Sequence, residues 1–278
     1  MSRGSYFLVV ILTVCTPILP RCKQQDVRVK PHSSTWLQLP DYHASFYEEL
    51  AERIWHNESG RSVQKLVWWN DGESFMSLGI GHFLWFPTGR PAPFTQTFPD
   101  MLTFMQQKGQ QLPTWLGATK SSCPWTDRNQ VINNTHDLQL QELRDFLQST
   151  ITLQADFIAH RFEESCLLLV DSVPARQRSL LKKRIGTLAS TPQGLYALID
   201  YVNFKGDGTN KQERYLNKGW GLLQVISLID AAAFDKNPRA AFVAAAEKVL
   251  KQRVEHAPPA RHEERWLAGW INRIHTYL

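Results

Sequence analysis

The amino-acid sequence predicts an α+β protein that is mostly helical and carries a small β-ribbon near its N-terminal end. Apolar residues recur at three- and four-residue steps through most of the chain, which is typical of amphipathic helices. Two short runs of strand-forming residues flank an Asn-Asp-Gly turn, which indicates a β-hairpin. The chain has 278 residues, 43% of them hydrophobic, so it can bury a sizeable core, and no internal repeat indicates a solenoid.

An apolar segment at the N-terminus predicts export from the cell. Arg3 precedes an apolar run over residues 6–19, which is similar to a signal-peptide core and too short for a membrane-spanning helix. Residues 1–22 are therefore either removed as a signal peptide or retained as a membrane tether, and residues 23–41 form an irregular lead-in. Removal lowers the formal net charge from +5 to +3, because Arg3 and Arg21 leave with the segment. The remaining charge is dispersed, so we expect no nucleic-acid partner.

Two cysteines, Cys123 and Cys166, remain after the predicted signal peptide. In an oxidising compartment such a pair favours a disulfide bond, and two buried free thiols are the alternative. The sequence has no Cys-x-x-Cys motif and no His-Glu-x-x-His helix, so we expect neither a metal nor a cofactor.

The first predicted helix runs from Tyr42 to Gly60. Its apolar side chains, Ile54 among them, recur on one face, and the same face continues to Glu58. Glycine commonly ends a helix, so Gly60 places Glu58 in the last turn. We expect the Glu58 carboxyl to lie against an apolar surface there.

The chain after this helix predicts a hairpin and then a series of helices. Strands are expected over 66–69 and 75–80, on either side of the turn at 70–72. Residues 114–134 form a polar connector. Helices are expected over 99–108, 137–169, 174–188, 192–204, 219–232, 238–254 and 259–277. Three of these begin with a proline in the first turn, where its missing N–H costs nothing.

Glu58 and Asp71 are the candidate pair of catalytic carboxyls. Cleavage of a glycosidic bond uses one protonated and one ionised carboxyl, so the environments of the two must differ. Glu58 ends an apolar helix face, whereas Asp71 lies in a polar turn where its charge stays solvated. The simpler alternative is a surface acid and a turn-forming residue, and Glu73 and Glu52 are the rival acids.

The segment Ser77-Leu78-Gly79-Ile80-Gly81-His82 resembles the Thr-Ile-Gly-Ile-Gly-His motif of the T-even phage-type lysozymes. In that family an Asp stands six residues before the Thr and eleven before the His. Asp71 stands at the same two offsets from Ser77 and His82.

A second segment, residues 197–206, matches the family's Ala-Leu-Ile-x-x-Val-x-x-x-Gly helix without a gap. The chain departs from the family near Glu58. The spacing from Glu58 to Asp71 is 13, four residues longer than in the family, and Ser59 intervenes before Gly60. These departures leave the assignment of Glu58 less direct than that of Asp71.

The resemblance implies a two-lobed lysozyme-like fold over residues 42–278. The small lobe would span about 42–95 and the helical lobe about 96–278, with the cleft between them. The expected partner is peptidoglycan or a related amino-sugar polymer, and the sequence leaves the oligomeric state open.

The resemblance also implies roles for the residues of the motif. Glu58 would be the general acid, Asp71 its ionised partner, and Ser77 the residue that holds the attacking water. His82 would have a structural role, since the family's histidine pairs with a neighbouring carboxylate.

Three further positions are candidates for binding substrate or for shaping the site. Gly79 and Gly81 would let the backbone approach a sugar, or would simply allow a tight turn or a bulge. Asn203, on the second matching segment, is a further candidate cleft residue.

Three hypotheses about function follow. The first is a peptidoglycan-hydrolysing muramidase, and the second is a lytic transglycosylase, which can work with one glutamate and no water-holding pair. The third is a non-catalytic glycan-binding envelope protein on the same scaffold. We expect the bacterial periplasm or cell envelope, because glycosylation of the Asn57-Glu58-Ser59 sequon in a eukaryote would put a glycan beside the proposed acid.

Overall fold

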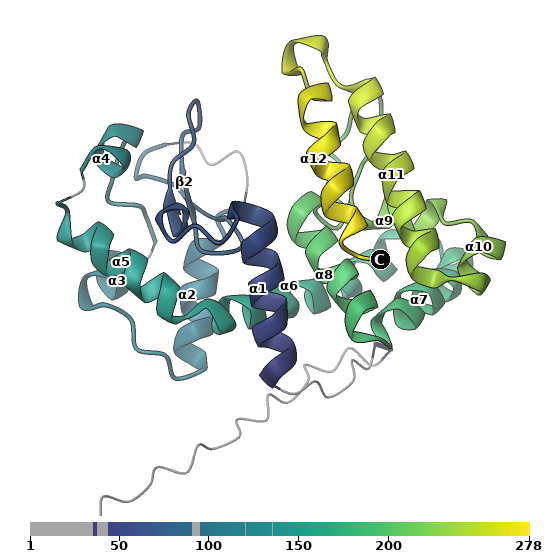
Figure 1. Cartoon of the computed structure of the whole chain (residues 1–278), viewed down its shortest axis with the longest axis horizontal. Helices are drawn as coiled ribbons and strands as arrows, with labels where there is room; N and C mark the ends of the chain where they lie inside the picture. Colours follow the sequence, from purple (N-terminus) through teal and green to yellow (C-terminus); the bar gives the residue numbers. More distant parts are fainter. Residues whose placement is uncertain (1–35, 38–43, 91–94, 120, 135) are drawn as a thin grey trace, which may run out of the picture. The chain divides into compact units, whose positions relative to one another are not determined.

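The computed structural model describes residues 36–37, 44–90, 95–119, 121–134 and 136–278 (Figure 1). The predicted signal peptide or tether, and most of the predicted lead-in, lie outside these residues. None of the described helices is long and apolar enough to cross a membrane. The described chain is mostly helical with one small antiparallel sheet, which confirms the predicted fold class at that level.

The first helix, α1 (Ala44–Ser59), ends as the sequence predicts. The Gly60 N–H donates to the His56 carbonyl at 2.9 Å, which is the bond of a left-handed C-terminal cap. Gly60 has a φ of +61°, a conformation that glycine adopts without steric cost. Glu58 therefore lies in the last turn of α1.

The β-ribbon follows α1. A 3₁₀ turn, η1 (Gln64–Leu66), leads into β1 (Val67–Trp68), β2 (Met76–Leu78) and β3 (Phe83–Trp85), which pair antiparallel in that order. The register places Trp68 opposite Ser77. The strands β1 and β2 are shorter than predicted. Residues 79–80 lie in the turn after β2, and the Trp69 indole donates to the Glu73 carbonyl at 2.8 Å within the loop that joins the two strands.

Helices make up most of the remaining described chain. They are α2 (Phe98–Gln107), α3 (Thr114–Thr119), α4 (Arg128–Ile132), α5 (Leu138–Ser149), α6 (Ile151–Ser172), α7 (Ala175–Ala189), α8 (Pro192–Lys205), α9 (Leu222–Leu228), α10 (Ala231–Lys236), α11 (Pro238–His256), the 3₁₀ turn η2 (Pro259–Arg261) and α12 (Glu264–His275). The short helices α3 and α4 lie in the segment predicted as a polar connector. Three predicted helices are wrong as single elements: 137–169 divides into α5 and α6, 219–232 into α9 and α10, and 259–277 into η2 and α12.

The break between α5 and α6 follows from side-chain hydrogen bonds. Thr150 Oγ1 donates to the Phe146 carbonyl at 2.8 Å, and Gln154 Nε2 donates to the Leu147 carbonyl at 2.6 Å. Because side chains satisfy both carbonyls, the backbone can leave the helical ladder at Thr150 without losing hydrogen bonds. At the second break, the Asp230 side chain caps the start of α10.

Helix α6 is the central element of the core. It packs against α1 and α2 as well as against α7 and α8. Figure 1 shows the ribbon with α2–α5 on one side of the molecule, here called the ribbon side, and α7–α12 on the other, here called the helical side. The fully buried Gln154 of α6 accepts the Ile80 N–H at 2.8 Å, which ties the turn after β2 to the core.

Gly79 and Gly81 are required by the close packing of this turn. A Cβ on Gly79 would lie 2.2 Å from Gln154 Oε1, and one on Gly81 would lie 2.7 Å from the Phe83 ring. Gly79 also has a φ of +65°, which side chains rarely tolerate. Of the alternatives that the sequence leaves open for these glycines, the tight turn accounts for both.

The disulfide expectation is wrong for this structure, in which Cys123 and Cys166 are free, buried thiols. Cys123 Sγ lies 3.2 Å from Met76 Sδ, against the ribbon, whereas Cys166 is fully buried in α6. Burial raises the pKa of the Cys123 thiol to about 12, so this thiol stays protonated. The connector is held instead by the Trp125 indole, which donates to the Asp137 carboxylate at 2.9 Å.

Gly79→Ala should destabilise the protein by about 2–3 kcal/mol, because the new methyl group meets Gln154 at a position whose φ already disfavours a side chain. Urea unfolding followed by circular dichroism measures the loss. Gly117→Ala is the matched control, since Gly117 lies in α3 with open space around it. That control should change the free energy of unfolding by at most about 1 kcal/mol, and equal losses in the two variants would contradict this account of the turn.

Candidate active site

The carboxyl of Glu58 is contacted from three directions. Arg273 Nη2 of α12 lies 2.6 Å from Oε1, and Asn203 Nδ2 of α8 donates to the same oxygen at 3.1 Å. His82 Nδ1, in the turn after β2, lies 3.3 Å from Oε2. The Glu58 side chain is 12% exposed, so the group is largely but not completely covered. The structure thus brings together Glu58, His82 and Asn203, three of the residues identified from the sequence.

The expected apolar environment of Glu58 is wrong. Its partners are a guanidinium, an amide and an imidazole, because elements far apart in the sequence converge on the end of α1. Arg273 stabilises the ionised carboxylate, whereas the C-terminal end of α1 disfavours a negative charge there. Arg273 and the C-terminal end of α1 therefore act on a charge at Glu58 in opposite directions.

Arg273 is shared between two carboxylates. Its Nε and Nη2 donate to the two oxygens of Asp200 at 2.9 and 2.8 Å, and Asp200, fully buried, also accepts the Tyr277 hydroxyl at 2.6 Å. Burial by itself would lower the pKa of Arg273, but the carboxylates of Asp200 and Glu58 raise it above its ordinary value. One guanidinium thus faces two acids, so a single proton on Glu58 would make this group of three electrically neutral.

Lys205, the last residue of α8, is a buried amine near the same group. Its Nζ lies 3.4 Å from the centroid of the Trp270 ring. Burial lowers the pKa of Lys205 to about 6, and the charges of Arg253 and Arg273 act in the same direction. Lys205 is therefore mostly neutral at pH 7 and adds little positive charge beside Glu58.

The loop between β1 and β2 carries two acids, Asp71 and Glu73, which differ in their exposure. Asp71 is exposed at the tip of the loop, and no hydrogen bond or ion pair joins it to Glu58 or His82 within the part of the chain that the structure describes. Glu73 is half-buried and accepts from Asn70 Nδ2 at 3.0 Å. Burial raises the pKa of Glu73, while the Asn70 hydrogen bond and the His82 charge oppose this. Of the two acids of this loop, the rival Glu73 is therefore the one on which the charge of His82 acts.

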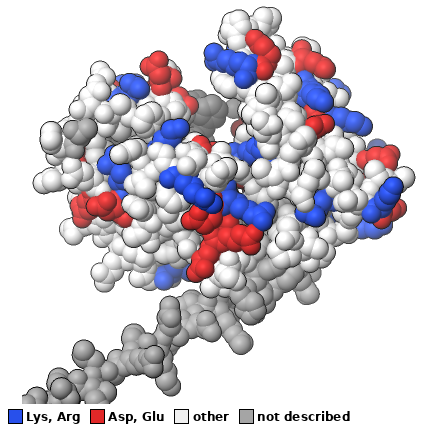
Figure 2. Space-filling model, in the orientation of Figure 1, with Lys and Arg blue, Asp and Glu red and all other residues white. Residues whose placement is uncertain are grey.

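No hydrogen bond or ion pair joins Ser77 or Glu52 to Glu58 among the described residues. Ser77 is buried in the central strand, opposite Trp68 and Leu84. Glu52 is exposed and forms an ion pair with Arg61 at 2.8 Å. Figure 2 shows acidic side chains gathered over α1 with basic side chains beside them. Glu52 is thus an ordinary surface ion-pair residue.

The sequence pattern does not mark Arg273, Asp200 or Lys205 as members of the site. A signal for two of them does exist, since Asp200 and Lys205 are the charged residues of α8, and its other buried residues are uncharged. A charge on a buried helix face needs a partner, so such residues are candidates for a buried network. The partner of Asp200 lies 73 residues downstream, and nothing local marks Arg273.

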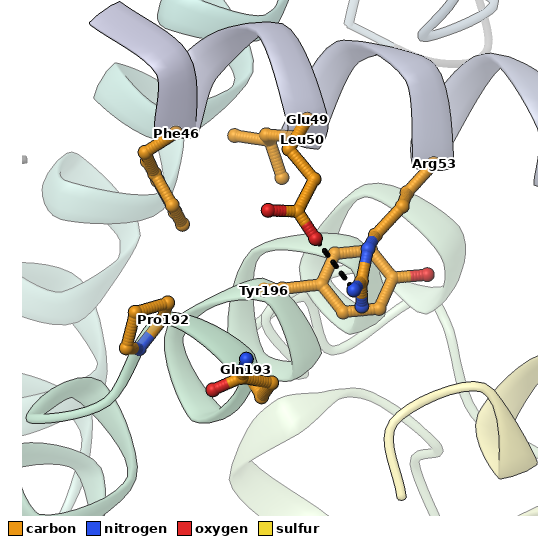
Figure 3. Close-up of a pocket in the computed structure, with 7 residues that line it drawn as sticks. All are labelled: Phe46, Glu49, Leu50, Arg53, Pro192, Gln193 and Tyr196. Atoms are coloured by element: carbon orange, nitrogen blue, oxygen red, sulfur yellow. Dashed lines mark hydrogen bonds and ion pairs between the residues drawn. The ribbon is translucent and has the colours of Figure 1, made fainter. Parts of the chain in front are cut away.

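A separate shallow pocket lies between α1 and the start of α8 (Figure 3). Its lining comprises Phe46, Glu49, Leu50, Arg53, Pro192, Gln193 and Tyr196. Arg53 pairs with Glu49 at 2.6 Å and lies 4.8 Å over the ring of Tyr196. Because its acid is already ion-paired at the surface, this pocket is a weaker candidate for chemistry than the Glu58 group.

The Glu58 group lies where the two sides of the described chain meet. His82 comes from the ribbon side, and Asn203 and Arg273 come from the helical side. Figure 2 shows the surface hollowed between these two sides. No protein-family model, curated protein or solved structure matches this chain.

Lys205→Met should stabilise the protein at pH 7, and the gain should shrink as the pH rises. Between the folded pKa of about 6 and the unfolded value of 10.5, the unfolded chain binds a proton that the folded chain does not. Stability of the parent protein therefore rises with pH in this window, by at most about 1.4 kcal/mol per unit. Urea unfolding at pH 7 and pH 9 should give a gain that is about 2 kcal/mol larger at pH 7.

The matched control is Lys211→Met, which removes an exposed lysine from the loop after α8. It should change stability by less than about 0.5 kcal/mol at both pH values. A gain from Lys205→Met that does not depend on pH would mean that the buried lysine carries its proton in the folded state.

Proposed function

We propose that the protein is a glycosidase that cleaves the glycan strands of peptidoglycan, with Glu58 as its general acid. The observation that carries this proposal is the largely covered Glu58 carboxyl at the end of α1, contacted by Arg273 and Asn203 from one side and His82 from the other. The resemblance of residues 77–82 to the phage-type lysozyme motif supports it, because that motif includes His82. A two-lobed lysozyme-like fold and export to a bacterial envelope belong to the same proposal.

The contacts of Glu58 suit a group that gives up a proton. Donation to the glycosidic oxygen lets the carbon–oxygen bond break and leaves Glu58 ionised. Arg273 and Asn203 stabilise that ionised product through charge-assisted hydrogen bonds.

The second carboxyl has two candidates. Asp71 stands at the offset that the lysozyme motif requires, and Ser77 would hold the attacking water beside it. Glu73 is half-buried and lies within electrostatic reach of His82, which contacts Glu58. We retain Asp71 and Ser77 as the pair that the resemblance implies, with Glu73 as the alternative that its surroundings favour.

A lytic transglycosylase is the second candidate function. The observation in its favour is the exposed Asp71, which has no bond to the Glu58 group among the described residues. A transglycosylase closes the sugar on itself and needs no carboxylate to manage a water. The two activities differ in the glycan ends that they leave.

Glu58→Gln should lower the rate of peptidoglycan cleavage by about 100-fold or more, because the amide keeps the shape of the side chain but cannot donate the proton. Release of soluble fragments from purified peptidoglycan measures the rate. Glu52→Gln is the matched control, since it makes the same change on an exposed residue of the same helix, and it should leave the rate unchanged. Equal rates in wild type and Glu58→Gln would reject Glu58 as the acid.

Asp71→Asn and Glu73→Gln should separate the candidates for the second carboxyl. If water is activated, one of the two variants should lose about 100-fold in rate while the other stays near wild type. Mass spectrometry of the wild-type products then identifies the reaction. Reducing ends indicate hydrolysis, whereas anhydro-muramyl ends, together with full activity in both variants, would replace the hydrolase with the transglycosylase.

A further inference from the structure

The two oxygens of the Glu58 carboxyl have different partners. Oε1 accepts from Arg273 Nη2 at 2.6 Å and from Asn203 Nδ2 at 3.1 Å, so both of its lone pairs are used. Oε2 has one partner among the described residues, His82 Nδ1 at 3.3 Å. A protonated Glu58 therefore carries its proton on Oε2, the oxygen that faces His82.

Of the three side chains that contact this carboxyl, His82 is the one that can exchange a proton with it. The Arg273 guanidinium does not lose its proton in proteins, and the Asn203 amide donates N–H groups without ionising. An imidazole gains and loses a proton between about pH 5 and 8. The proton on Oε2 and the proton on Nδ1 therefore belong to one exchanging pair of groups.

His82 also connects the covered carboxyl to solvent. Its side chain is 38% exposed, whereas that of Glu58 is 12% exposed. Nδ1 faces Glu58, and Nε2 makes no hydrogen bond or ion pair within the part of the chain that the structure describes. Glu58 on α1 and Glu73 in the loop between β1 and β2 are the acids that interact with the ring. One ring nitrogen thus lies at the candidate acid while the other is open to water.

We propose that His82 is the positioning residue that returns a proton to Oε2 of Glu58 after each cleavage. In the chemical step the Oε2 proton passes to the glycosidic oxygen, which keeps the electron pair of the broken carbon–oxygen bond. Nδ1 then gives its proton to Oε2 while Nε2 takes one from solvent, and exchange with solvent restores the starting tautomer. The attacking water releases one proton for each proton taken up, so the cycle balances.

The inference rests on the proposed function and adds to it the oxygen of Glu58 that donates and the group that resupplies the proton. Two substitutions separate this role from a structural one. His82 has a φ of +49°, which asparagine and glycine both adopt readily, so neither should strain the turn. His82→Asn keeps an N–H donor for Oε2 but carries no exchangeable proton, and His82→Gly leaves a space the size of an imidazole. Each should lower the rate of peptidoglycan cleavage by about tenfold or more.

Rescue by free imidazole is the readout that a structural role would not move. Imidazole should raise the rate of His82→Gly several-fold and leave His82→Asn unchanged, because only glycine makes room for the ring. His262→Asn is the matched control, since His262 has the same φ of +49° and its Nδ1 lies 3.5 Å from the exposed Glu264 carboxylate. That control should keep the wild-type rate. Full activity in His82→Asn, or no rescue of His82→Gly, would overturn the inference.

A measurement without substrate distinguishes failure of this inference from failure of the proposed function. Proton exchange between Oε2 and Nδ1 predicts that Glu58→Gln changes the nitrogen chemical shift of His82 Nδ1 in NMR spectra and leaves that of His262 unchanged. Such a change, in a wild-type protein that cleaves no peptidoglycan, would support the exchange and reject the glycosidase. Cleavage by the wild type with an unchanged His82 signal in Glu58→Gln would overturn the inference and leave the glycosidase standing.

Discussion

The position of the candidate acid depends on one buried arginine. Arg273 reaches across from α12 to bind Asp200 on α8 and Glu58 at the end of α1, so a single guanidinium joins three helices. Removing one partner from such a buried group typically costs about 3–5 kcal/mol, since the remaining charge is left unpaired. The ion pairs thus link the packing of α12 to the orientation of the Glu58 carboxyl, so neither can change without the other.

A second buried ion pair extends this arrangement along α12. Arg253 and Glu263 hold the start of the helix, as Arg273 and Asp200 hold its end. Lys205 lies between the two pairs with its terminal amine against an aromatic ring, and its lowered pKa leaves it mostly neutral. Both pairs combine charge with close hydrogen bonds, which is what makes burial of these groups tolerable. The helix is therefore anchored at both ends, with Trp266 and Trp270 between the two ion pairs.

The ribbon is joined to the core by a polar contact as well as by packing. Gln154 accepts the Ile80 N–H and donates to the Leu147 carbonyl, and both bonds are buried. The same side chain leaves room only for glycine at position 79. The turn that carries His82 is consequently held in one conformation. His82 meets Glu58 because this turn and the end of α1 are each fixed separately against α6.

The sequence alone determines the features that depend on neighbouring residues. Gly60 marks the end of α1, and Pro192 marks the start of α8, because capping and the proline ring act within a single helical turn. The surroundings of Glu58 are different: its strongest partner, Arg273, lies 215 residues away, and no local pattern links the two. Only the tertiary structure decides such contacts, along with the free state of the two thiols. Each depends on which distant side chains packing brings within a few ångströms, and hydrophobic periodicity does not specify that.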